Sequence, residues 1–570
     1  MNYQPPLEDS RFIAFDVLKA DRALAALPAF AEVDRDLMTQ VLEEAGKFVA
    51  DVVAPLQTVG DQVGCHFEQG RVTTPPGFRD AYQAFWQAGW PALSSAPEDG
   101  GQGLPAMLEA VLYEMLSAAN HGWTMAPGLL HGAYECIKHH ASDDLKARYL
   151  QKVATGEWLA TMCLTEPHAG SDLGLARTRA VPQPDGSYRL TGTKIFISGG
   201  EHDLSDNIVH LVLARLPDAP PGPKGLSLFL VPKFMPDGSR SAVHCDRIEE
   251  KMGLHGSPTC VMRFDDASCW IVGEPGRGLA AMFIMMNAAR LHVALQGVGL
   301  LDAAWQKANA YSLERRQMRA PGRGKSAAEA DLIAEHPAMR RILDTQRAWI
   351  DGGRVLAYRT ALELDRAKHL ASADPAAAAS AQRWCSLITP VLKSAWTEQA
   401  FAGGSACLQV LGGHGYVSEW GIEQIVRDSR VAMIYEGTNE IQAIDLLVRK
   451  VLADGGQGLS ALLVDLAAQL PEGHAGQGRV RRLEAVTATL VQAAPGDATL
   501  PYEVADDYLR AVALVLLDWA WARIDATPGA QVPRWQAPRQ ALVRHVLPEF
   551  EMRLRIIESR CAESREGAVA

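Results

Sequence analysis

The sequence predicts a mostly helical α+β protein in four parts, and three observations lead to this fold class. Apolar residues recur at helical spacing over residues 1–157. Segments rich in β-formers and separated by turns follow over residues 158–272. Long helical patterns return over residues 273–455, and further helices are expected over 456–570. We therefore expect an N-terminal helical domain, a middle β domain, a helical bundle and a C-terminal helical extension.

The N-terminal helical domain is predicted from apolar periodicity. Within residues 33–53, Leu37, Val41 and Val49 fall on one helical stripe, and Pro55 ends the pattern. Further helical patterns cover residues 78–88, 104–119 and 145–154.

The β domain is predicted from short segments of β-formers between Gly, Pro and Asp clusters. Residues 187–198 (SYRLTGTKIFIS) show this composition. The other expected strands are residues 207–214, 225–231 and 259–264. Strands of this length joined by turns predict a compact β domain.

The helical bundle is predicted from a long apolar-periodic stretch over residues 279–318, which ends in charges, and a polar loop over 320–335 follows it. Further helices are expected over residues 336–368, 377–402 and 439–452. A linker at residues 453–458 (ADGGQG) leads into the extension. The extension, residues 456–570, carries twelve Arg, no Lys and fourteen acidic residues, and so has a net charge of −2.

The composition excludes several classes of protein. Of the 570 residues, 48% are hydrophobic and 21% charged, which is enough apolar surface to exclude a mainly disordered chain. The net charge of −12 disfavours general binding to nucleic acid or anionic membranes. Nine cysteines without a CxxC pair disfavour a disulfide framework and indicate a reducing, cytoplasmic compartment. The polar N-terminus predicts no secretory signal, and no apolar run reaches the ~18 residues of a membrane span.

Residues 162–172 (MCLTEPHAGSD) form the first segment that can carry chemistry. The Thr-Glu-Pro step and the Ala-Gly-Ser-Asp that follows predict a strand that ends in a loop. Such a loop can present backbone N–H groups and hydroxyls to an anion or to the polar edge of a ring. From these residues alone, a surface turn is the alternative.

Residues 435–442 (YEGTNEIQ) form the second segment. Thr438 is expected to cap the helix that follows, which places Glu436 on a loop near a positive helix end. A carboxylate at such a junction, in an apolar cleft, suits a general base. Taken alone, an acidic residue of the cap region is the alternative.

Two further segments also have two interpretations each. Residues 411–416 (LGGHGY) contain paired glycines, which allow a ligand to approach the backbone closely or form a helix–helix turn. Residues 311–318 (YSLERRQM) carry the positive pair Arg315 and Arg316 at the end of a helix. That pair can bind phosphates or form a solvated face.

Motifs of several common enzyme classes are absent from the sequence. No HExxH and no GxSxG occur, so a metal hydrolase or a common serine hydrolase has no anchor, and no metal site is expected. Gly297 and Gly299 lie within a helical pattern with no strand before them, which does not support a nicotinamide-binding fold.

In this order and spacing, the four segments together resemble the acyl-CoA dehydrogenase family of flavoproteins, over roughly residues 40–450. The resemblance implies the acyl-CoA dehydrogenase fold of a helical domain, a β domain and a helical bundle, here followed by the helical extension of longer members. Three segments are similar to the branch that contains the 3-methylmercaptopropionyl-CoA dehydrogenases. They are TGTKIFISGGEHDLSDN (191–207), KMGLHGSPTC (251–260) and ERRQM (314–318).

The resemblance implies the mechanism by which the family carries out the dehydrogenation step of fatty acid β-oxidation. Glu436 matches the catalytic carboxylate, which removes a proton from the carbon next to the thioester carbonyl while a hydride leaves the neighbouring carbon for N5 of FAD. The product is a trans-2-enoyl-CoA. In the family, the backbone N–H of the base and a flavin hydroxyl form an oxyanion hole for the thioester oxygen. Some members place the base in the segment that matches residues 286–291, but MNAARL contains no carboxylate, which favours Glu436.

The resemblance also implies the contacts with FAD. Residues 162–171 match the stretch beside the isoalloxazine ring, with Thr165 at its polar edge, and residues 196–198 match a segment that is usually Trp-Ile-Thr. Residues 315–318 match those that hold the dinucleotide of the neighbouring subunit, and 409–413 match the glycine turn at the pyrophosphate and adenosine end. The expected cofactor-binding residues are Met162, Leu164, Thr165, Gly170, Ser171, Phe196, Ile197, Ser198, Arg315, Gln317, Met318, Gln409, Gly412, Gly413, Thr438, Asn439 and Glu440.

Fewer contacts with the acyl-CoA substrate carry over. The matching positions are Ser171, Asn287, Arg290 and Gly437. Two of the expected site residues depart from the family's pattern, because Asn287 replaces a common Asp and Glu440 stands where Gln is common. The motifs do not specify the chain length, branching or sulfur content of the acyl group.

The resemblance implies electron-transfer flavoprotein as the electron acceptor. It also implies a homodimer, because a helical extension tends to occupy the face that shorter, tetrameric members use for their second dimer. An acyl-CoA oxidase, which passes electrons to oxygen, shares the fold and the base and is an open alternative. A flavin-containing DNA-binding protein of the alkylation-response branch is disfavoured, because it needs a basic surface that the extension lacks overall.

Overall fold

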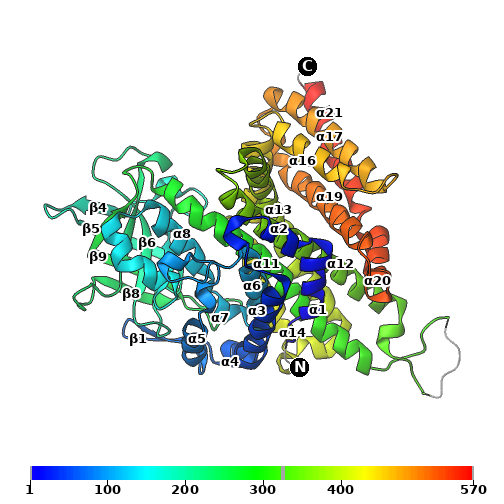
Figure 1. Ribbon diagram of the computed structural model, residues 1–570, viewed down its shortest axis with the longest axis horizontal. Helices are drawn as coiled ribbons and strands as arrows, with labels where there is room; N and C mark the ends of the chain where they lie inside the picture. Colours follow the sequence, from blue (N-terminus) through cyan, green and yellow to red (C-terminus); the bar gives the residue numbers. More distant parts are fainter. Residues whose placement is uncertain (1–2, 323–327, 568–570) are drawn as a thin grey trace. The chain divides into compact units, whose positions relative to one another are not determined.

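The computed structural model describes residues 3–322 and 328–567, and Figure 1 shows it as a ribbon. The chain forms two compact units, residues 44–292 and residues 3–43 together with 293 onwards. Each unit is described by itself. Helices dominate and one domain is a β-sheet, so the expected α+β, mostly helical class is confirmed. The domain boundaries at residues 157, 272 and 455 stay a prediction.

In the unit of residues 44–292, helices precede the sheet. Helix α5 is amphipathic and buries Phe78, Tyr82 and Phe85 on one face, as its apolar spacing predicts. Helix α6 is buried from residue 107 to 119, so it lies at the centre of this helical part. The elements are η3 (Val49–Val53), α4 (Gln57–Val63), β1 (His66–Glu68), β2 (Arg71–Thr73), α5 (Phe78–Gln87), α6 (Ala106–Ala119), α7 (His121–Thr124), α8 (Leu130–His140), α9 (Asp143–Leu145) and α10 (Gln151–Ala154).

The same unit contains a seven-stranded sheet with the strand order β3-β6-β4-β5-β9-β7. A pairing between β6 and β7 closes the path into a ring, and β8 pairs with β9. Apolar side chains from several strands, among them Val212, Phe229, Met262 and Phe264, form its core. The strands are β3 (Leu159–Cys163), β4 (Arg179–Pro182), β5 (Tyr188–Ser198), β6 (Ile208–Arg215), β7 (Leu226–Pro232), β8 (Val243–Ile248) and β9 (Thr259–Val272).

The four expected strands are confirmed as β5, β6, β7 and β9, with one difference in length. Strand β9 continues to Val272 rather than ending at Phe264, although Asp265 and Asp266 interrupt its apolar pattern. Pairing with β5, β7 and β8 outweighs the low strand propensity of these aspartates. Strands β4 and β8 were not expected, because β4 ends in a proline and β8 is rich in charged residues.

The unit of residues 3–43 and 293 onwards is almost wholly helical. Helices α3 and α11 run through the sequence boundaries of the two units. The helices are α1 (Leu7–Arg11), η1 (Phe12–Val17), α2 (Ala20–Ala25), α3 (Arg35–Phe48), α11 (Gly278–Glu314), α12 (Pro337–His369), α13 (Pro375–Val410), α14 (Ile422–Arg430), α15 (Asn439–Ile444), η15 (Asp445–Val451), α16 (Gln457–Ala468), α17 (Ala475–Ala493), α18 (Leu500–Glu503), α19 (Ala505–Asp525), α20 (Pro533–Ala541) and α21 (Glu549–Gly567).

Two expected helix ends are wrong. Helix α11 ends at Glu314 and not at Met318, because the backbone there pairs with a later segment: the N–H of Gln317 donates to the carbonyl of Asp331 at 3.0 Å. Helix α13 continues past residue 402 to Val410. Its Gly-Gly pair, which favours a helix end in sequence, is buried within the helix instead.

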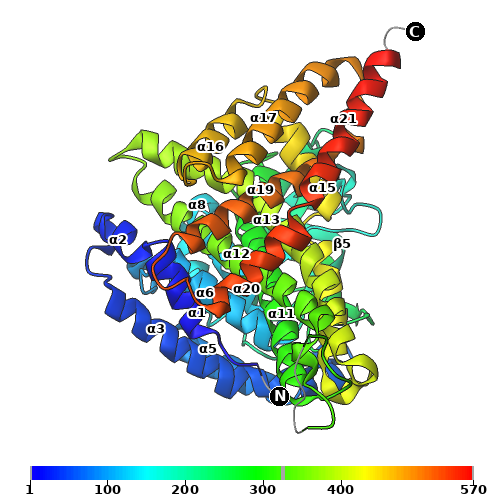
Figure 2. The same ribbon diagram turned by 90° about the vertical axis from the view of Figure 1, so that its right-hand side faces the viewer.

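Helices of the C-terminal extension pack on one another and on the bundle (Figure 2). Helix α19 approaches α12 closely at Gly352, where a Cβ atom would overlap the side chain of Leu517. Beside it, the indole N–H of Trp521 donates to the carbonyl of Ala348 at 2.8 Å. The extension is therefore part of the same compact unit as the bundle.

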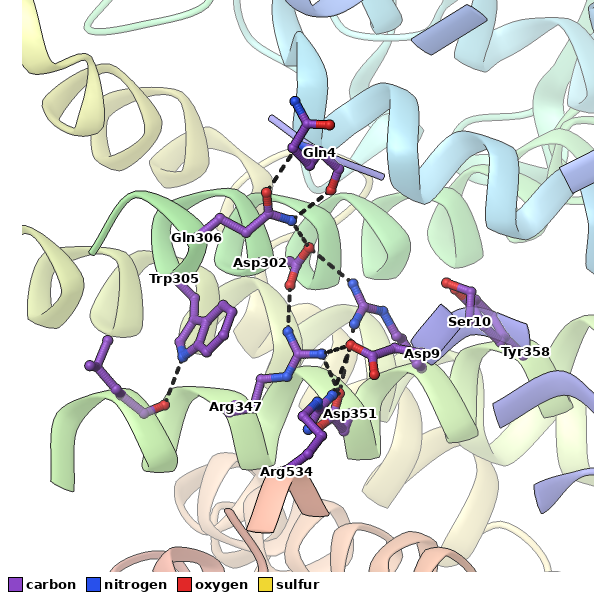
Figure 3. Close-up of polar contacts among 12 residues, drawn as sticks. Gln4, Asp9, Ser10, Asp302, Trp305, Gln306, Arg347, Asp351, Tyr358 and Arg534 are labelled. Carbon is purple, nitrogen blue, oxygen red and sulfur yellow. Dashed lines mark hydrogen bonds and ion pairs between the residues drawn. The ribbon is translucent and has the colours of Figure 1, made fainter. Parts of the chain in front are cut away.

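A buried network of ion pairs joins the N-terminal segment, α11, α12 and α20 (Figure 3). Arg347 donates to Asp302 at 3.0 Å, and Arg534 donates to both carboxylate oxygens of Asp351, at 2.8 and 3.0 Å. Because three arginines meet three aspartates, the charges balance. The members are Asp9, Asp302, Asp351, Arg347, Arg354 and Arg534.

Helix α11 is also long and apolar enough, by length and composition, to cross a membrane. Of its most apolar window, 56% is buried within the protein, and a buried core helix passes the same test. The expected absence of a membrane span stays a prediction.

Candidate functional site

Two of the expected flavin segments lie side by side in the unit of residues 44–292. The loop after β3 runs against the end of β5, where the N–H of Ile195 donates to the carbonyl of Thr165 at 2.9 Å. The ammonium group of Lys194 donates to the carbonyl of Leu164 at 3.0 Å. Residues 164–165 and 196–198 are thus neighbours in space.

Phe196 has an unusual backbone at this point. Its φ is +59°, in the left-handed region that non-glycine residues rarely adopt, and its side chain is 61% exposed. The pairing of β5 with β9 shifts register between Lys194 and Ile197, which is a β-bulge. The bulge turns a large aromatic ring towards solvent while Ile197 stays in the core, an arrangement typical of a ligand-binding site.

The other expected residues of this loop differ in exposure. Met162 is buried in β3, Leu164, Thr165 and Ser198 are half-buried, and Gly170 and Ser171 are exposed. On α11, two expected substrate residues contact each other, because the guanidinium of Arg290 donates to the side-chain oxygen of Asn287 at 3.4 Å. Arg290 is buried and Asn287 is exposed.

In the other unit, Glu436 lies on the loop before α15 in a strained backbone. Its φ is +57°, and that of Gly437 is +84°. Thr438 caps α15, since its hydroxyl accepts a hydrogen bond of 3.3 Å from the N–H of Ile441, as the sequence predicts. Thr438 also forms a hydrogen bond with the side chain of Glu440, and this bond lowers the pKa of the Glu440 carboxyl.

Buried polar side chains hold this loop. The amide of Gln442 donates to the carbonyl of Glu436 at 3.0 Å. The ammonium group of Lys393, on α13, donates to the carbonyl of Gly437 at 2.8 Å and to the side chain of Asn439 at 3.1 Å. The half-buried Glu436 therefore lies on a backbone that is held at its own carbonyl and at the residue that follows it.

The segments 311–318 and 411–416 also meet in this unit. The hydroxyl of Tyr311 and Nδ1 of His414 are 2.8 Å apart. Gln409, Gly412 and Gly413 are exposed, and Gly412 has a φ of +58°. The glycine turn therefore lies beside the chain that leads to Arg315.

Residues 315–318 are exposed and extended. Besides the bond at Gln317, the N–H of Ile333 donates to the carbonyl of Arg315 at 2.8 Å, so this segment pairs with residues 331–333. Met318 has a φ of +58° and a side chain that is 78% exposed. An exposed arginine and an exposed thioether on a fixed backbone are suited to contact a ligand or a second subunit.

Three domain models of one family together match most of this chain. They are "Acyl-CoA dehydrogenase, N-terminal domain" over residues 37–157, "middle domain" over 161–267 and "C-terminal domain" over 276–451. The chain belongs to the acyl-CoA dehydrogenase family. It is an oxidoreductase of the flavoprotein class, and the resemblance stated from its motifs is confirmed.

Two relatives agree with this family, and one solved structure shares the fold. The 3-methylmercaptopropionyl-CoA dehydrogenase of Ruegeria pomeroyi is 44% identical over 84% of this chain and 82% of that protein. The broad-specificity linear acyl-CoA dehydrogenase FadE5 of Mycobacterium tuberculosis is 35% identical over 85% of this chain and 81% of that protein. The structure of an acyl-CoA dehydrogenase complexed with FAD from Bacillus anthracis has a TM-score of 0.72 at 22% identity, and the match covers 94% of this chain and 89% of that one.

The residues expected to bind FAD fit that cofactor. A Cβ atom added at Gly170, Gly412 or Gly413 would meet nothing within 4 Å, so a phosphate or ring can approach the backbone closely there. The ring of Phe196 offers an exposed aromatic face, and the exposed Arg315 offers a donor for phosphate.

Three residues of this acyl-CoA dehydrogenase's site region were not expected from the sequence. Lys393 stands alone in a buried apolar stretch of α13 (LITPVLKSAW), which is a signal for a structural cation. Lys194 lies at an inward position of β5, two and four residues from Gly192 and Leu190. Its partner Glu166 lies inside the first motif. For both lysines, the feature that could have identified them in the sequence is a charged residue at a core-facing position.

Proposed function

We propose that this chain oxidises an acyl-CoA thioester to a trans-2-enoyl-CoA, with Glu436 as the base and FAD as the cofactor. One observation carries the proposal: the carboxylate that matches the family's base stands on a strained loop whose carbonyls are held by Gln442 and Lys393. A strained backbone that the surrounding structure holds in place is a feature of functional sites.

The chain's own residues remove the proton and stabilise the negative charge that develops. The carboxylate of Glu436 takes the proton from the carbon next to the thioester carbonyl. Negative charge develops on the thioester oxygen, and the backbone N–H of Glu436 is proposed to donate to it, which by analogy with other oxyanion holes is worth about 3 kcal/mol. When bound, FAD supplies the two-electron acceptor for the hydride that leaves the next carbon.

We assign the FAD contacts to two groups of residues. The first comprises the loop and strand residues of one unit, and the second the exposed extended segment, the glycine turn and the start of α15. The first group is Met162, Leu164, Thr165, Gly170, Ser171, Phe196, Ile197 and Ser198. The second group is Arg315, Gln317, Met318, Gln409, Gly412, Gly413, Thr438, Asn439 and Glu440. For the substrate we assign Ser171, Asn287, Arg290 and Gly437.

The first test is an anaerobic titration of the purified protein with acyl-CoAs of graded chain length, followed by the visible flavin band. Bleaching by one class of thioester supports FAD, the reaction and the substrate class together. A colourless protein that cannot be reconstituted with FAD contradicts the proposal. Oxygen admitted afterwards distinguishes a dehydrogenase that uses electron-transfer flavoprotein from an oxidase, in which the band returns quickly.

The role of Glu436 is tested by Glu436→Gln, which keeps the shape of the side chain and removes the base. We expect flavin reduction to slow by several orders of magnitude, about 10⁴-fold, with FAD still bound. Glu419→Gln is the control, because Glu419 is exposed on the short helix η13 (Ser418–Trp420) and is not among the assigned site residues. Near-normal reduction in Glu436→Gln means that the base lies elsewhere.

We further propose 3-methylmercaptopropionyl-CoA as the substrate. The support is the 44% identity with the Ruegeria pomeroyi enzyme, together with the three segments similar to that branch. The measurement is kcat/KM for this thioester against straight-chain acyl-CoAs of similar length. A far smaller value for the methylmercapto substrate contradicts the assignment.

We also propose a cytoplasmic homodimer that binds neither nucleic acid nor a membrane. The support for the dimer is the helical extension packed on the bundle, which shorter, tetrameric members lack. Light scattering should give twice the chain mass of 61.7 kDa, and a mass four times that of the chain contradicts a dimer.

A further inference from the structure

A buried ion pair connects the loop after β3 to strand β5. The ammonium group of Lys194 lies 2.8 Å from the carboxylate of Glu166, and the side chains are 0% and 3% exposed. The same carboxylate accepts hydrogen bonds from the N–H of Arg177 at 2.7 Å, and from the N–H and the hydroxyl of Thr178 at 3.1 and 2.6 Å. Lys194, Arg177 and Thr178 therefore all bond to this one carboxylate.

The pair lies between two groups of residues assigned to FAD. Leu164 and Thr165 directly precede Glu166, and residues 196–198 follow Lys194 within four positions. Lys194 also donates to the carbonyl of Leu164 at 3.0 Å, so one ammonium group holds the backbone and the side chain of the loop. Lys194 therefore helps to set the distance between the two segments, together with the hydrogen bond from the N–H of Ile195 to the carbonyl of Thr165.

A buried ion pair adds little net stability, since desolvation offsets much of the attraction, but its hydrogen bonds have fixed directions. Burial raises the pKa of the Glu166 carboxyl, but the charge of Lys194 and the hydrogen bonds from Lys194 and Thr178 lower that pKa by more. The carboxylate therefore stays ionised near neutral pH and keeps all its acceptor roles. What the pair contributes is a fixed position for the loop.

We propose that Glu166 and Lys194 are positioning residues, which hold the loop after β3 and the bulge of β5 at the spacing that FAD binding needs. This inference rests on the proposed function, because it takes the two segments as flavin contacts. It predicts that loss of the pair weakens FAD binding more than it weakens the fold.

The test compares two lysine variants of the full-length enzyme. Lys194→Met removes the cation of this pair, and Lys233→Met removes the cation of a second buried pair in the same β domain, that of Lys233 and Glu201. Apoprotein of each is titrated with FAD. We expect the Kd for FAD to rise about tenfold in Lys194→Met and to change less than about threefold in Lys233→Met. An unchanged Kd in Lys194→Met, or an equal rise in both variants, overturns the inference.

Hydrogen–deuterium exchange gives a readout that does not depend on catalysis. Faster exchange over residues 159–171 and 188–198 in the Lys194→Met apoprotein supports the positioning role, and wild-type exchange there overturns it. If Lys194→Met does not fold, the double variant Lys194→Met/Glu166→Leu leaves no unpaired charge and takes its place in both measurements. A wild-type chain that binds no FAD overturns this inference and the proposed function, whereas one that binds FAD but is reduced by no thioester overturns only the proposed function.

Discussion

The Nζ atom of Lys393 donates a hydrogen bond of 2.8 Å to the carbonyl oxygen of Gly437, the residue that follows the proposed base. Lys393 is fully buried in α13 and also contacts Asn439, so one cation holds the loop and the start of α15. The left-handed backbone of Glu436 lies directly before this anchor. The position of the proposed base is therefore coupled to a residue of another helix.

We expect Lys393→Met to slow flavin reduction about tenfold at saturating acyl-CoA and to lower the free energy of unfolding by about 1–3 kcal/mol, because buried acceptors lose their charged donor. Stopped-flow absorbance and thermal unfolding measure the two effects. The control is Lys450→Met, which removes a lysine that donates to the carbonyl of Ser386 at 2.6 Å. Equal reduction rates in both variants and the wild type would show that the loop does not need Lys393.

The site residues that the sequence reveals are those with local signals. Local signals make Glu436 a candidate, because a glycine and a helix cap follow it, and the two adjacent glycines mark the turn, but the role of base comes only from the family resemblance. Lys393 pairs with a carbonyl 44 residues away, and Lys194 with a carboxylate 28 residues away. No local pattern shows such partners, because only the packing of helices or strands brings them together.

The fold could be predicted where apolar residues recur with a clear period. Prediction failed where hydrogen bonds to a distant segment set the backbone conformation. The apolar spacing of α5 and the β-formers of β5 are visible in the sequence. The bulge at Phe196 and the end of α11 before Met318 are not, because both positions adopt a positive φ without a glycine. At both places, hydrogen bonds to a distant segment override local preference.

We expect Asp302→Asn to destabilise the unit that contains the bundle by about 3–5 kcal/mol, because it leaves Arg347 and Arg354 buried without a full counter-charge. Thermal unfolding measures the loss, both at low salt and in about 1 M NaCl, where salt screens most interactions between exposed charges. Glu558→Gln is the control, since the pair of Glu558 and Arg482 is 45% and 46% exposed and should be worth at most about 1 kcal/mol. Similar losses in the two variants would contradict a structural role for the buried network.

We expect Gly352→Ala to destabilise the packing of the extension by about 1–3 kcal/mol, because the new methyl group overlaps the buried side chain of Leu517. Gly404→Ala is the matched control within a helix. Its Cβ would meet only Val426, at 3.7 Å, so the higher helix propensity of alanine should make it neutral or stabilising by up to about 1 kcal/mol. Chemical unfolding compares the two variants, and the prediction fails if Gly352→Ala is as stable as Gly404→Ala.

A buried carboxylate should make the unit of residues 44–292 sensitive to acid. Oε2 of Glu109 lies 3.2 Å from Nδ1 of His131, and Oε1 lies 3.8 Å from Nε2 of His292. Burial raises the pKa of Glu109, but the charge and hydrogen bond of His131, the charge of His292 and a hydrogen bond from Ser94 outweigh it and lower the pKa from 4.5 to about 2. Because the folded pKa is depressed, the stabilisation that is present just above pH 4.5, while the histidines still carry charge, is lost as the pH falls towards 2.

Glu109→Gln removes this dependence. Just above pH 4.5 the variant should be less stable than the wild type by about 3 kcal/mol, and the difference should shrink steadily as the pH falls from 4.5 towards 2. Thermal midpoints of both proteins over that range measure the gap, and Glu135→Gln is the control, because Glu135 is only partly buried and pairs with the exposed His139 at 3.0 Å. A gap that stays constant through this range would mean that Glu109 stabilises the unit through its shape and not through its charge.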